Sequence, residues 1–555
     1  MKTLILPLLF TFCSLFALAQ PDLEHSLHIN YKKCWPRNAS NIRLGHIIRG
    51  MQHSNGSVYG LVKPFSGGVS SDADGLARLN NDFDTMWTKK YGGSDEDNFQ
   101  FIEEMPNGRI LITGTTYSKD GDVWYGRPFA FNDMWLMLVD TNGNILKGNV
   151  FGGFSGRLSS TCLGADGSIY MAGFTEDNTL DFTHVQYSPG NTDLWYAKLD
   201  TGLNLLWCKV IPGDEVDFTT IIRSVNRDRL VLCSASPSMN ADFLPAEARG
   251  GVDHFVCYLD TAGNVIWKHR YGGTQNDLLQ DIQVDTARQL IYLLGNSQAG
   301  GGDFTYSTTD LYGQATPKSE NMGFICLDTL GNVKGAQMYG AATKYNNCEG
   351  SAWYAGAKIY KGRLWAGIYI LGSSYPLGPG WGDADSNVSY AGNTLIVVID
   401  STCTLKAKYT INGTGNDEVW DNFIKDSVLY FTGFNGGLPN NQMNTFRCDT
   451  ANTFQFIISF TNTPLEITEP TFPLNNQQFS IYPNPTQDIL TIEPQEASVQ
   501  EVYTLRIMSS DGRLLYRASK LKGRKQLQIA DWPVGIYYAE LEQKGIRQNI
   551  TFSKQ

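Results

Sequence analysis

The chain has 555 residues, enough for several domains or for one long repeat array. It contains 56 glycines and 12% aromatic residues, and only 18% of its residues are charged, a composition that suits short strands and tight turns. Its formal charge is −11 and it has no basic stripe, which argues against a nucleic-acid partner because an acidic surface repels phosphate backbones.

The N-terminus has the parts of a secretion signal. Lys2 supplies the positive start, Leu4–Leu18 is an apolar run, and Ala17–Ala19 is an A-x-A cleavage site. The pattern predicts a signal peptide that ends at Ala19 and a mature chain that begins at Gln20. The run is short for a bilayer and no later segment is as apolar, so no transmembrane segment is expected.

Removal of the leader takes away Lys2 and Cys13, which leaves a charge of −12 and nine cysteines. An odd number means that at least one thiol is free or pairs between molecules. Cys233, Cys257 and Cys326 lie in apolar strand patterns, so we expect most cysteines to be core residues.

One unit recurs along the chain, and it consists of an alternating strand, a turn, and a strand that ends in an aromatic or aliphatic residue before glycine. The first strands end at Asn80, Asp140, Asp200, Asp260, Asp328, Asp400 and Asp449, the first four of which are 60 residues apart. Turns such as Asp140–Asn144 place glycine where a hairpin needs positive φ.

A second strand pair lies between these hairpins, for example Phe99–Glu103 with Arg109–Thr115. Each unit thus has four short antiparallel strands and must stack on its neighbours, and radial stacking of such sheets is a β-propeller. We count seven units, which begin near Asn41, Asp97, Arg157, Asp217, Asp277, Cys348 and Asp417. Six or eight blades, or two smaller propellers, are the alternatives. The architecture resembles bacterial repeat β-propellers of no specific family.

Two segments compete for the outer strand of the last blade, namely Leu27–Lys33 and Thr453–Phe460. If the N-terminal segment adds there, it fastens the first and last blades together.

Composition changes after Phe460, where a linker with three prolines precedes a region of short alternating strands. These strands suffice for a small two-sheet sandwich. The predicted fold is therefore all-β: a seven-bladed β-propeller of four-stranded blades followed by a small β-sandwich. The expected boundaries are a signal peptide over 1–19, the propeller over 20–460, a linker over 461–476 and a C-terminal domain over 477–555.

Three motifs follow one another in the C-terminal domain: Ile481–Pro485 (IYPNP), Ser510–Leu514 (SDGRL) and Pro533–Tyr537 (PVGIY). Each alone is an ordinary turn. Together, at the extreme C-terminus, they resemble the type A sorting domain of the type IX secretion system over Gln477–Gln555. The residues that carry the resemblance are Tyr482, Pro483, Asn484, Pro485, Asp511, Gly512, Gly535 and Tyr537.

The resemblance implies a route and partners. Such proteins cross the inner membrane with the signal peptide and the outer membrane with this domain, which a sorting peptidase of the cysteine class usually removes. Many stay attached to surface lipopolysaccharide. We therefore expect an extracellular or outer-surface location reached through the periplasm, with the type IX machinery as partner. The resemblance says nothing of the propeller's activity.

An aspartate recurs six residues after the strand-ending residue, at Asp97, Asp217, Asp277 and Asp417. A repeated aspartate at the start of a unit favours a structural role, in which it accepts backbone N–H bonds. The alternative is calcium, because loops such as Ser94–Asp97 are rich in oxygen ligands. The calcium candidates are Asp95, Asp97, Asp217, Asp277 and Asp417, and no other cofactor is expected.

A second aspartate series, Asp122, Asp181, Asp242 and Asp303, precedes irregular loops. Variable loops on a repeating scaffold are common recognition sites. Their aromatic residues could stack on sugars or cover a partner, or else pack between blades; they are Trp124, Tyr125, Tyr187, Tyr306 and Tyr312.

Enzyme motifs are scarce. No H-E-x-x-H occurs among the seven histidines, and Gly295–Ala299 lacks the final glycine of a nucleophile elbow, so no catalytic residue is assigned. We predict a non-enzymatic module that binds a glycan or a protein. The alternative is a secreted hydrolase or lyase acting on polysaccharide, which acidic and aromatic residues converging at one mouth of the channel would favour.

Overall fold

The structure is a computed structural model of the 555-residue chain. It describes residues 25–36, 46–63, 75–123, 133–152, 156–176, 179–182, 191–298, 301–306, 321–339, 352–370, 393–411, 417–435, 454–464, 479–482, 486–494, 502–509, 514–543 and 546–554. The predicted signal peptide lies outside them.

The chain divides into two compact units, residues 1–465 and 466–555. The division falls inside the expected linker. None of the helices in the described ranges is long and apolar enough to cross a membrane.

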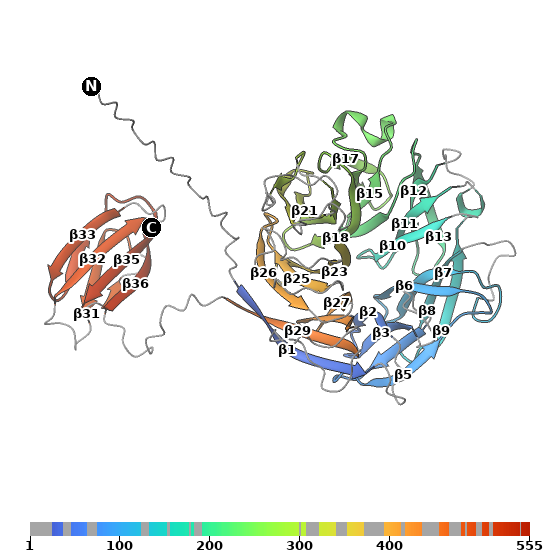
Figure 1. The fold of residues 1–555 in the computed structure, drawn as a ribbon, viewed down its shortest axis with the longest axis horizontal. Coiled ribbons are helices and arrows are strands. Elements are labelled where there is room, and N and C mark those ends of the chain that lie inside the picture. The colour runs from blue at the N-terminus through green and yellow to red at the C-terminus, as the bar shows by residue number, and fades with distance from the viewer. Residues whose placement is uncertain are drawn as a thin grey trace, which may run out of the picture. The chain divides into compact units, whose positions relative to one another are not determined.

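The first unit consists of antiparallel sheets placed radially around a centre (Figure 1). The first three contain β2 (His46–Gln52), β3 (Val58–Lys63), β4 (Gly75–Leu79) and β5 (Thr85–Lys90); β6 (Asp97–Glu104), β7 (Ile110–Thr116), β8 (Asp133–Val139) and β9 (Ile145–Phe151); and β10 (Arg157–Leu163), β11 (Ile169–Thr175), β12 (Asp193–Leu199) and β13 (Leu205–Ile211).

The next two sheets contain β14 (Thr220–Asn226), β15 (Arg229–Ser236), β16 (Asp253–Asp260) and β17 (Val265–Tyr271); and β18 (Asp277–Asp285), β19 (Leu290–Ser297), β21 (Asn321–Asp328) and β22 (Val333–Tyr339), with the short β20 (Thr305–Tyr306) added in parallel to β22. The last two contain β23 (Ala352–Tyr360), β24 (Arg363–Ile370), β25 (Asn393–Ile399) and β26 (Leu405–Ile411); and β27 (Asp417–Lys425), β28 (Val428–Asn435), β29 (Phe454–Pro464) and β1 (His25–Pro36). The short helices η1 (Leu180–Phe182), η2 (Ala241–Phe243) and η3 (Pro245–Glu247) lie between strands.

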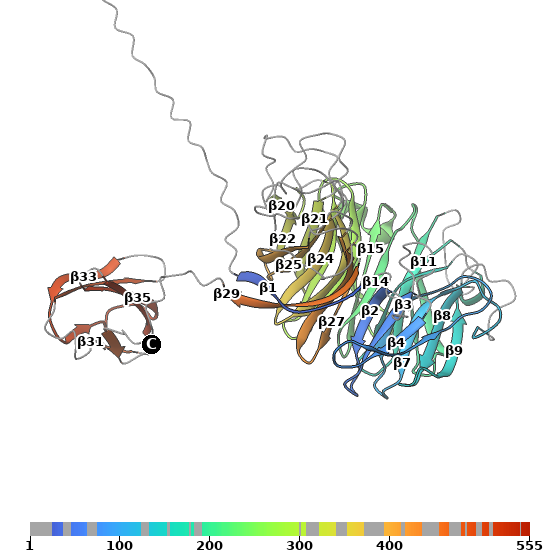
Figure 2. The same ribbon diagram turned by 60° about the horizontal axis from the view of Figure 1, so that its bottom comes forward.

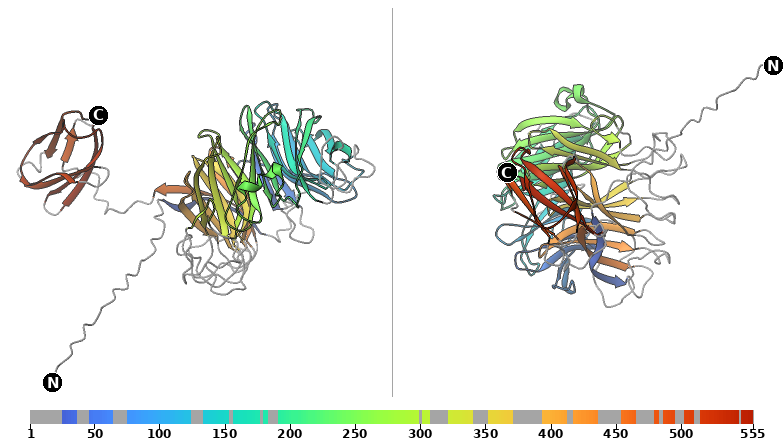
Figure 3. Two further views of the ribbon diagram at one scale, coloured as in Figure 1. Left: turned by 90° about the horizontal axis from the view of Figure 1, so that it is seen from above. Right: turned by 90° about the vertical axis from the view of Figure 1, so that its left-hand side faces the viewer.

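The described residues of this unit thus form seven sheets, which we call blades 1 to 7 in the order given. Their innermost strands contact one another in the closed order β2, β6, β10, β14, β18, β23, β27 and back to β2. Figure 3 shows the blades side by side from two further directions. The predicted all-β propeller of four-stranded blades is confirmed.

Blade 7 uses both of the segments that were expected to compete. β29 is its third strand and continues to Pro464, past the expected end of the propeller at Phe460. β1 is its outermost strand and pairs with β29 from His25 to Pro36 (Figure 1). The two ends of the first unit therefore meet in one sheet, and this pairing closes the ring without a covalent link.

In blades 1, 4 and 5 a tyrosine at the end of the outer strand links the blade to the hairpin turn of the next blade. Tyr91 Oη donates to the carbonyl oxygen of Gly143 at 2.7 Å, and Tyr271 Oη donates to that of Gly331 at 2.6 Å. Both glycines have positive φ, which is why the repeat places glycine in this turn. Tyr339 Oη donates in the same way to the carbonyl oxygen of Cys403 at 2.8 Å, and Cys403 also has a positive φ, of 61°.

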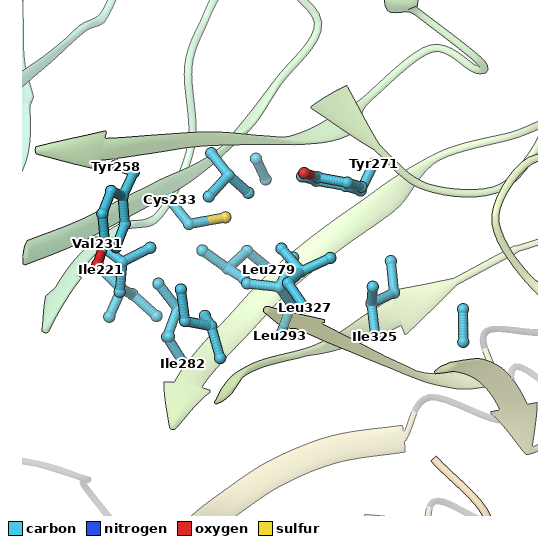
Figure 4. Packing of buried hydrophobic residues seen from close by; sticks show 14 of the residues in the cluster. Ile221, Val231, Cys233, Tyr258, Tyr271, Leu279, Ile282, Leu293, Ile325 and Leu327 are labelled. Carbon is cyan, nitrogen blue, oxygen red and sulfur yellow. The ribbon is translucent and has the colours of Figure 1, made fainter. Parts of the chain in front are cut away.

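The cores lie between neighbouring blades. Figure 4 shows the cluster between blades 4 and 5, where Ile221 and Val231 face Leu279 and Leu293. Six free cysteines lie in the described residues, and five of them are buried. Burial raises the pKa of thiols such as Cys257 to about 12, so these residues are inert core side chains.

The second unit is a β-sandwich (Figure 2). One sheet has β30 (Phe479–Tyr482), β31 (Ile489–Pro494) and β34 (Lys525–Gln528), and the other has β32 (Tyr503–Ser509), β33 (Leu514–Leu521), β35 (Gly535–Gln543) and β36 (Ile546–Lys554). Its core includes Phe479, Leu490, Leu505 and Phe552.

Candidate functional site

The central channel of the propeller holds a cavity of about 1050 Å³, lined by residues of all seven innermost strands. Several of these strands contain a β-bulge near the same place, for example at Gln100, Ser159 and Gln280. A bulge bends and twists its strand and can redirect side chains. The charged residues of the channel lie at the level of these bulges or further from the start of each strand.

Six of the seven innermost strands contribute one charged residue to a belt around the channel, and the signs alternate. In blade order the belt is Arg49, Glu103, no charge in blade 3, Arg223, Asp281, Lys358 and Asp421. The belt has three positive and three negative members. Glu104 also lines the cavity, but its carboxylate accepts from the backbone and hydroxyl of Ser54.

Two arginines of the belt each connect their own blade to two others through side-chain contacts. Arg223 of blade 4 lies 2.8 Å from the Asp281 carboxylate of blade 5 and donates to Ser160 Oγ of blade 3 at 2.7 Å. Arg49 of blade 1 lies 3.2 Å from Asp421 of blade 7 and donates to the carbonyl oxygen of Gln100 in blade 2. The belt therefore holds neighbouring blades together around the axis.

Two acids of the belt have raised pKa values. Burial raises the pKa of Glu103, opposed by the charges of Arg223 and Lys358 and by a hydrogen bond from Leu163. Burial likewise raises the pKa of Asp421, opposed chiefly by Arg49. A carboxyl of raised pKa in a cleft is a candidate proton donor, but it also occurs in structural ion-pair networks.

The sequence did not single out any member of this belt. The repeat places polar residues within apolar inner strands, as at Arg223 and Asp281, and that signal was available. Their convergence depends on the closed ring, which no single strand reveals.

The first aspartate series lies at the other end of the inner strands, where each strand begins. Asp97 is buried, and its carboxylate accepts from Gly93 N at 2.7 Å, from Ser118 Oγ at 2.8 Å and from Thr116 Oγ1. The corresponding contacts of Asp217 are with Ser236 and Ser238, and those of Asp277 are with Gly273 and Ser297.

The remaining calcium candidates differ from these. Asp95 is exposed, and Asp417 is the first residue of β27. No group of three or more His, Cys, Asp or Glu side chains within the described ranges is arranged to hold a metal ion. The first series instead receives hydrogen bonds from its own chain, so the structural role remains the favoured expectation.

Chelation is therefore expected to change stability little. The mature chain should melt within about 2 °C of its usual temperature in excess EDTA. If calcium were bound to the folded chain, it would stabilise that chain by mass action, and its removal by EDTA would lower the melting temperature. Thermal unfolding with EDTA, and with added CaCl₂ as the control, measures this. A drop of many degrees that calcium restores would contradict the structural role.

Asp277 makes the folded state sensitive to pH. Burial raises the pKa of its carboxyl to about 7, with a further contribution from Asp253, whose Oδ1, like Oδ1 of Asp277, has no hydrogen-bond partner among the described residues. A carboxyl whose pKa is higher in the folded chain than in the unfolded chain adds to the free energy of unfolding. This contribution is complete below the unfolded pKa near 4 and is lost as the pH rises through 7.

Asp277→Asn should remove this dependence. Relative to the variant, the wild type is expected to lose up to about 4 kcal/mol of unfolding free energy between about pH 4 and pH 8. Denaturant titrations at several pH values check this, and parallel curves for the two proteins would refute it.

The second aspartate series binds the loop between the second and third strands to the end of the preceding blade. Asp181 Oδ2 accepts from Gly152 N at 2.8 Å, and Asp303 Oδ2 accepts from Gly272 N at 3.0 Å. Asp242 lacks this bond because Pro212 stands in the glycine's place and has no N–H, and it pairs with Lys268 instead.

A third aspartate series was missed in the sequence. Asp133, Asp193 and Asp253 begin the third strands of blades 2 to 4, and all are buried. Asp253 forms a fully buried ion pair with Arg270, at 3.0 Å. Arg270 also donates to the carbonyl oxygens of Ser236 and Ser238.

Few residues of the proposed recognition loops lie within the described ranges. Tyr306 belongs to β20 and pairs with Met338 of β22 through the backbone. The other aromatic candidates, Trp124, Tyr125, Tyr187 and Tyr312, lie outside the described residues.

The C-terminal motifs divide into buried and exposed residues. Tyr537 is buried, stacks on Phe552 with ring centroids 5.5 Å apart, and donates to the carbonyl oxygen of Pro533. Tyr482 is more exposed and donates to Glu493. Gly535 begins β35 opposite Lys554.

The five other motif residues lie outside the described ranges: Pro483, Asn484, Pro485, Asp511 and Gly512. Residues 480–552 match the family model described as the secretion system C-terminal sorting domain. The C-terminal unit is a sorting domain of this family. It implies export through type IX secretion to the cell surface or the extracellular space.

The propeller resembles several solved structures at low sequence identity. The RRP9 WD40 repeats are 8% identical, covering 78% of this chain and 97% of that chain with a TM-score of 0.42. A DUF4221 family member from Bacteroides vulgatus is 9% identical, covering 80% and 99% with a TM-score of 0.36. A protein of unknown function from Dyadobacter fermentans is 8% identical, covering 79% and 99% with a TM-score of 0.33. No curated protein matches the chain. The fold assignment therefore rests on the strand order itself.

Removing the sorting domain should stop export without unfolding the propeller. In a host with type IX machinery, a chain that ends at Leu465 is expected to accumulate in the periplasm, because the two units are separately compact. Tyr537→Ala should block export by emptying the core of the domain, whereas the half-exposed neighbour Tyr538→Ala should not. Cell fractionation with immunoblotting measures this, and surface delivery of the truncated chain would contradict it.

Proposed function

We propose that this chain is a non-enzymatic binding protein of the cell exterior, which recognises a glycan or a protein ligand in the central channel of its propeller. The signal peptide starts export, the type IX machinery completes it, and the sorting peptidase removes the C-terminal domain. The mature working part is then the propeller, released or attached to the outer surface.

The composition of the channel carries this proposal. Arg49 and Arg223 hold Asp421 and Asp281 in ion pairs, so these two carboxylates are engaged with structural partners. A cavity of about 1050 Å³ is large enough for a ligand, and polar groups placed around a partly apolar wall are typical of binding sites.

A binding screen tests the proposal. Mature chain beginning at Gln20 is applied to glycan arrays and to surface-protein libraries. Each hit is measured again with Lys358→Ala, which alters the channel and breaks none of the ion pairs found among the described residues. The proposal expects a hit whose affinity falls in the variant. Hits that are all indifferent to the variant, or no hit, would reject it.

One observation favours the alternative of a polysaccharide-cleaving enzyme. Glu103 lies in the channel with a raised pKa, as a general acid requires. Release of reducing ends or of unsaturated products from polysaccharides, lost in Glu103→Gln, would establish catalysis in place of binding.

A further inference from the structure

The channel wall contains a polar side chain that has no partner. Asn422 of β27 lines the cavity and is only 4% exposed, yet neither its amide nitrogen nor its amide oxygen has a hydrogen-bond partner among the described residues. Leaving a buried donor or acceptor unpaired lowers the stability of the folded chain. An unpaired group of this kind at a cavity wall calls for an explanation, such as a bound water or a ligand.

An exposed aromatic ring lines the same cavity. Phe218 precedes β14 in blade 4 and is 41% exposed, whereas Phe101, the other phenylalanine of the wall, packs against a core cluster. Its backbone N–H donates to the carbonyl oxygen of Ala235, which fixes the backbone from which the ring projects. An exposed aromatic ring in a cleft offers a flat apolar surface on which a ligand can stack.

The charges of the wall are of both signs and do not favour a strongly charged ligand. The belt has equal numbers of positive and negative members, and two of its ion pairs, Arg49–Asp421 and Arg223–Asp281, are closed. No uniform field is available to attract a polyanion or a polycation. A polar ligand without net charge therefore fits the wall best.

We infer that the channel binds a neutral oligosaccharide. Sugar hydroxyls both donate and accept hydrogen bonds, so they satisfy the Asn422 amide once its side chain, buried in the unliganded wall, turns toward the cavity, and the apolar face of a pyranose ring fits the Phe218 ring. The Lys358 ammonium, exposed in the cavity, supplies further donors to ring or hydroxyl oxygens. This inference rests on the proposed function and names the ligand class of its channel.

The test combines binding with stability. Calorimetric titration of the mature chain uses cello-, malto-, xylo- and mannotetraose, with trigalacturonate and chitotriosamine as charged comparators. At least one neutral tetrasaccharide should bind, and Asn422→Ala and Phe218→Ala should each weaken it about tenfold or more. Asn422→Ala should melt no lower than the wild type, because it removes an unpaired buried amide.

Ser459 supplies the matched control. Its hydroxyl is also buried and without a partner among the described residues, but it does not line the cavity. Ser459→Ala should leave sugar binding unchanged.

Three results would overturn the inference: binding of the charged comparators only, no sugar binding at millimolar concentration, or sugar binding that Asn422→Ala leaves intact. If a protein ligand binds in the channel while sugars do not, the ligand class is wrong and the proposed function stands. If nothing binds there, both fail.

Discussion

Replacing Arg270 with methionine is expected to lower the free energy of unfolding by about 3–5 kcal/mol, the usual cost of leaving one member of a buried ion pair alone. Arg270 and Asp253 are both fully buried, and the guanidinium also donates to Ser236 and Ser238. The variant leaves the Asp253 carboxylate without its counter-ion in a site from which water is excluded. Urea titration of the mature chain measures the loss.

Two controls separate this effect from a general loss of charge. Lys334→Met breaks an exposed pair with Asp328 at 4.0 Å and should cost less than about 1 kcal/mol. Adding Asp253→Leu to Arg270→Met should recover part of the loss, because the unpaired charge is then gone. An Arg270→Met variant as stable as the wild type would show that the pair is not required.

Deleting residues 20–36 is expected to open the ring. β1 pairs with β29 at eleven positions, and the strand ladder contributes about ten hydrogen bonds at roughly 0.5–1.5 kcal/mol each, so the loss is of the order of 5 kcal/mol or more. The deletion also exposes the edge of β29, which should promote aggregation. Urea titration and light scattering check the two effects.

A synthetic peptide of residues 25–36 should restore stability when added to the shortened protein, because an extended segment can add to a free sheet edge. A scrambled peptide of the same composition is the control. A shortened protein that unfolds at the same urea concentration as the parent would mean that β1 does not close the ring.

The fold was accessible from the sequence because its signals are local and repeated. The 60-residue spacing of Asp140, Asp200 and Asp260 and the glycines in their turns predict hairpins that the structure confirms. The closure could not be settled in the same way. β1 and β29 are each plausible outer strands, and only the ring geometry shows that blade 7 accommodates both.

The candidate site was not accessible, for a physical reason. Arg49 and Asp421 are 372 residues apart and meet only because the ring brings blades 1 and 7 together. The unpaired amide of Asn422 is likewise a property of its surroundings and not of its neighbours in the chain. By contrast, Asp97 repeats with the unit, so its place at the start of an inner strand could be predicted.

Filling the channel tests the central claim, that the channel of this exported propeller is its ligand site. Ser159 of β10 lines the cavity in the one blade that adds no charge to the belt, so Ser159→Trp narrows the channel without removing an ion pair. Thr88→Trp, on the exposed outer strand β5, is the matched control. The measurement is the affinity of both variants for the best ligand of the binding screen, at unchanged melting temperature. The account predicts at least a tenfold loss for Ser159→Trp and none for Thr88→Trp; equal affinity in both variants would contradict it.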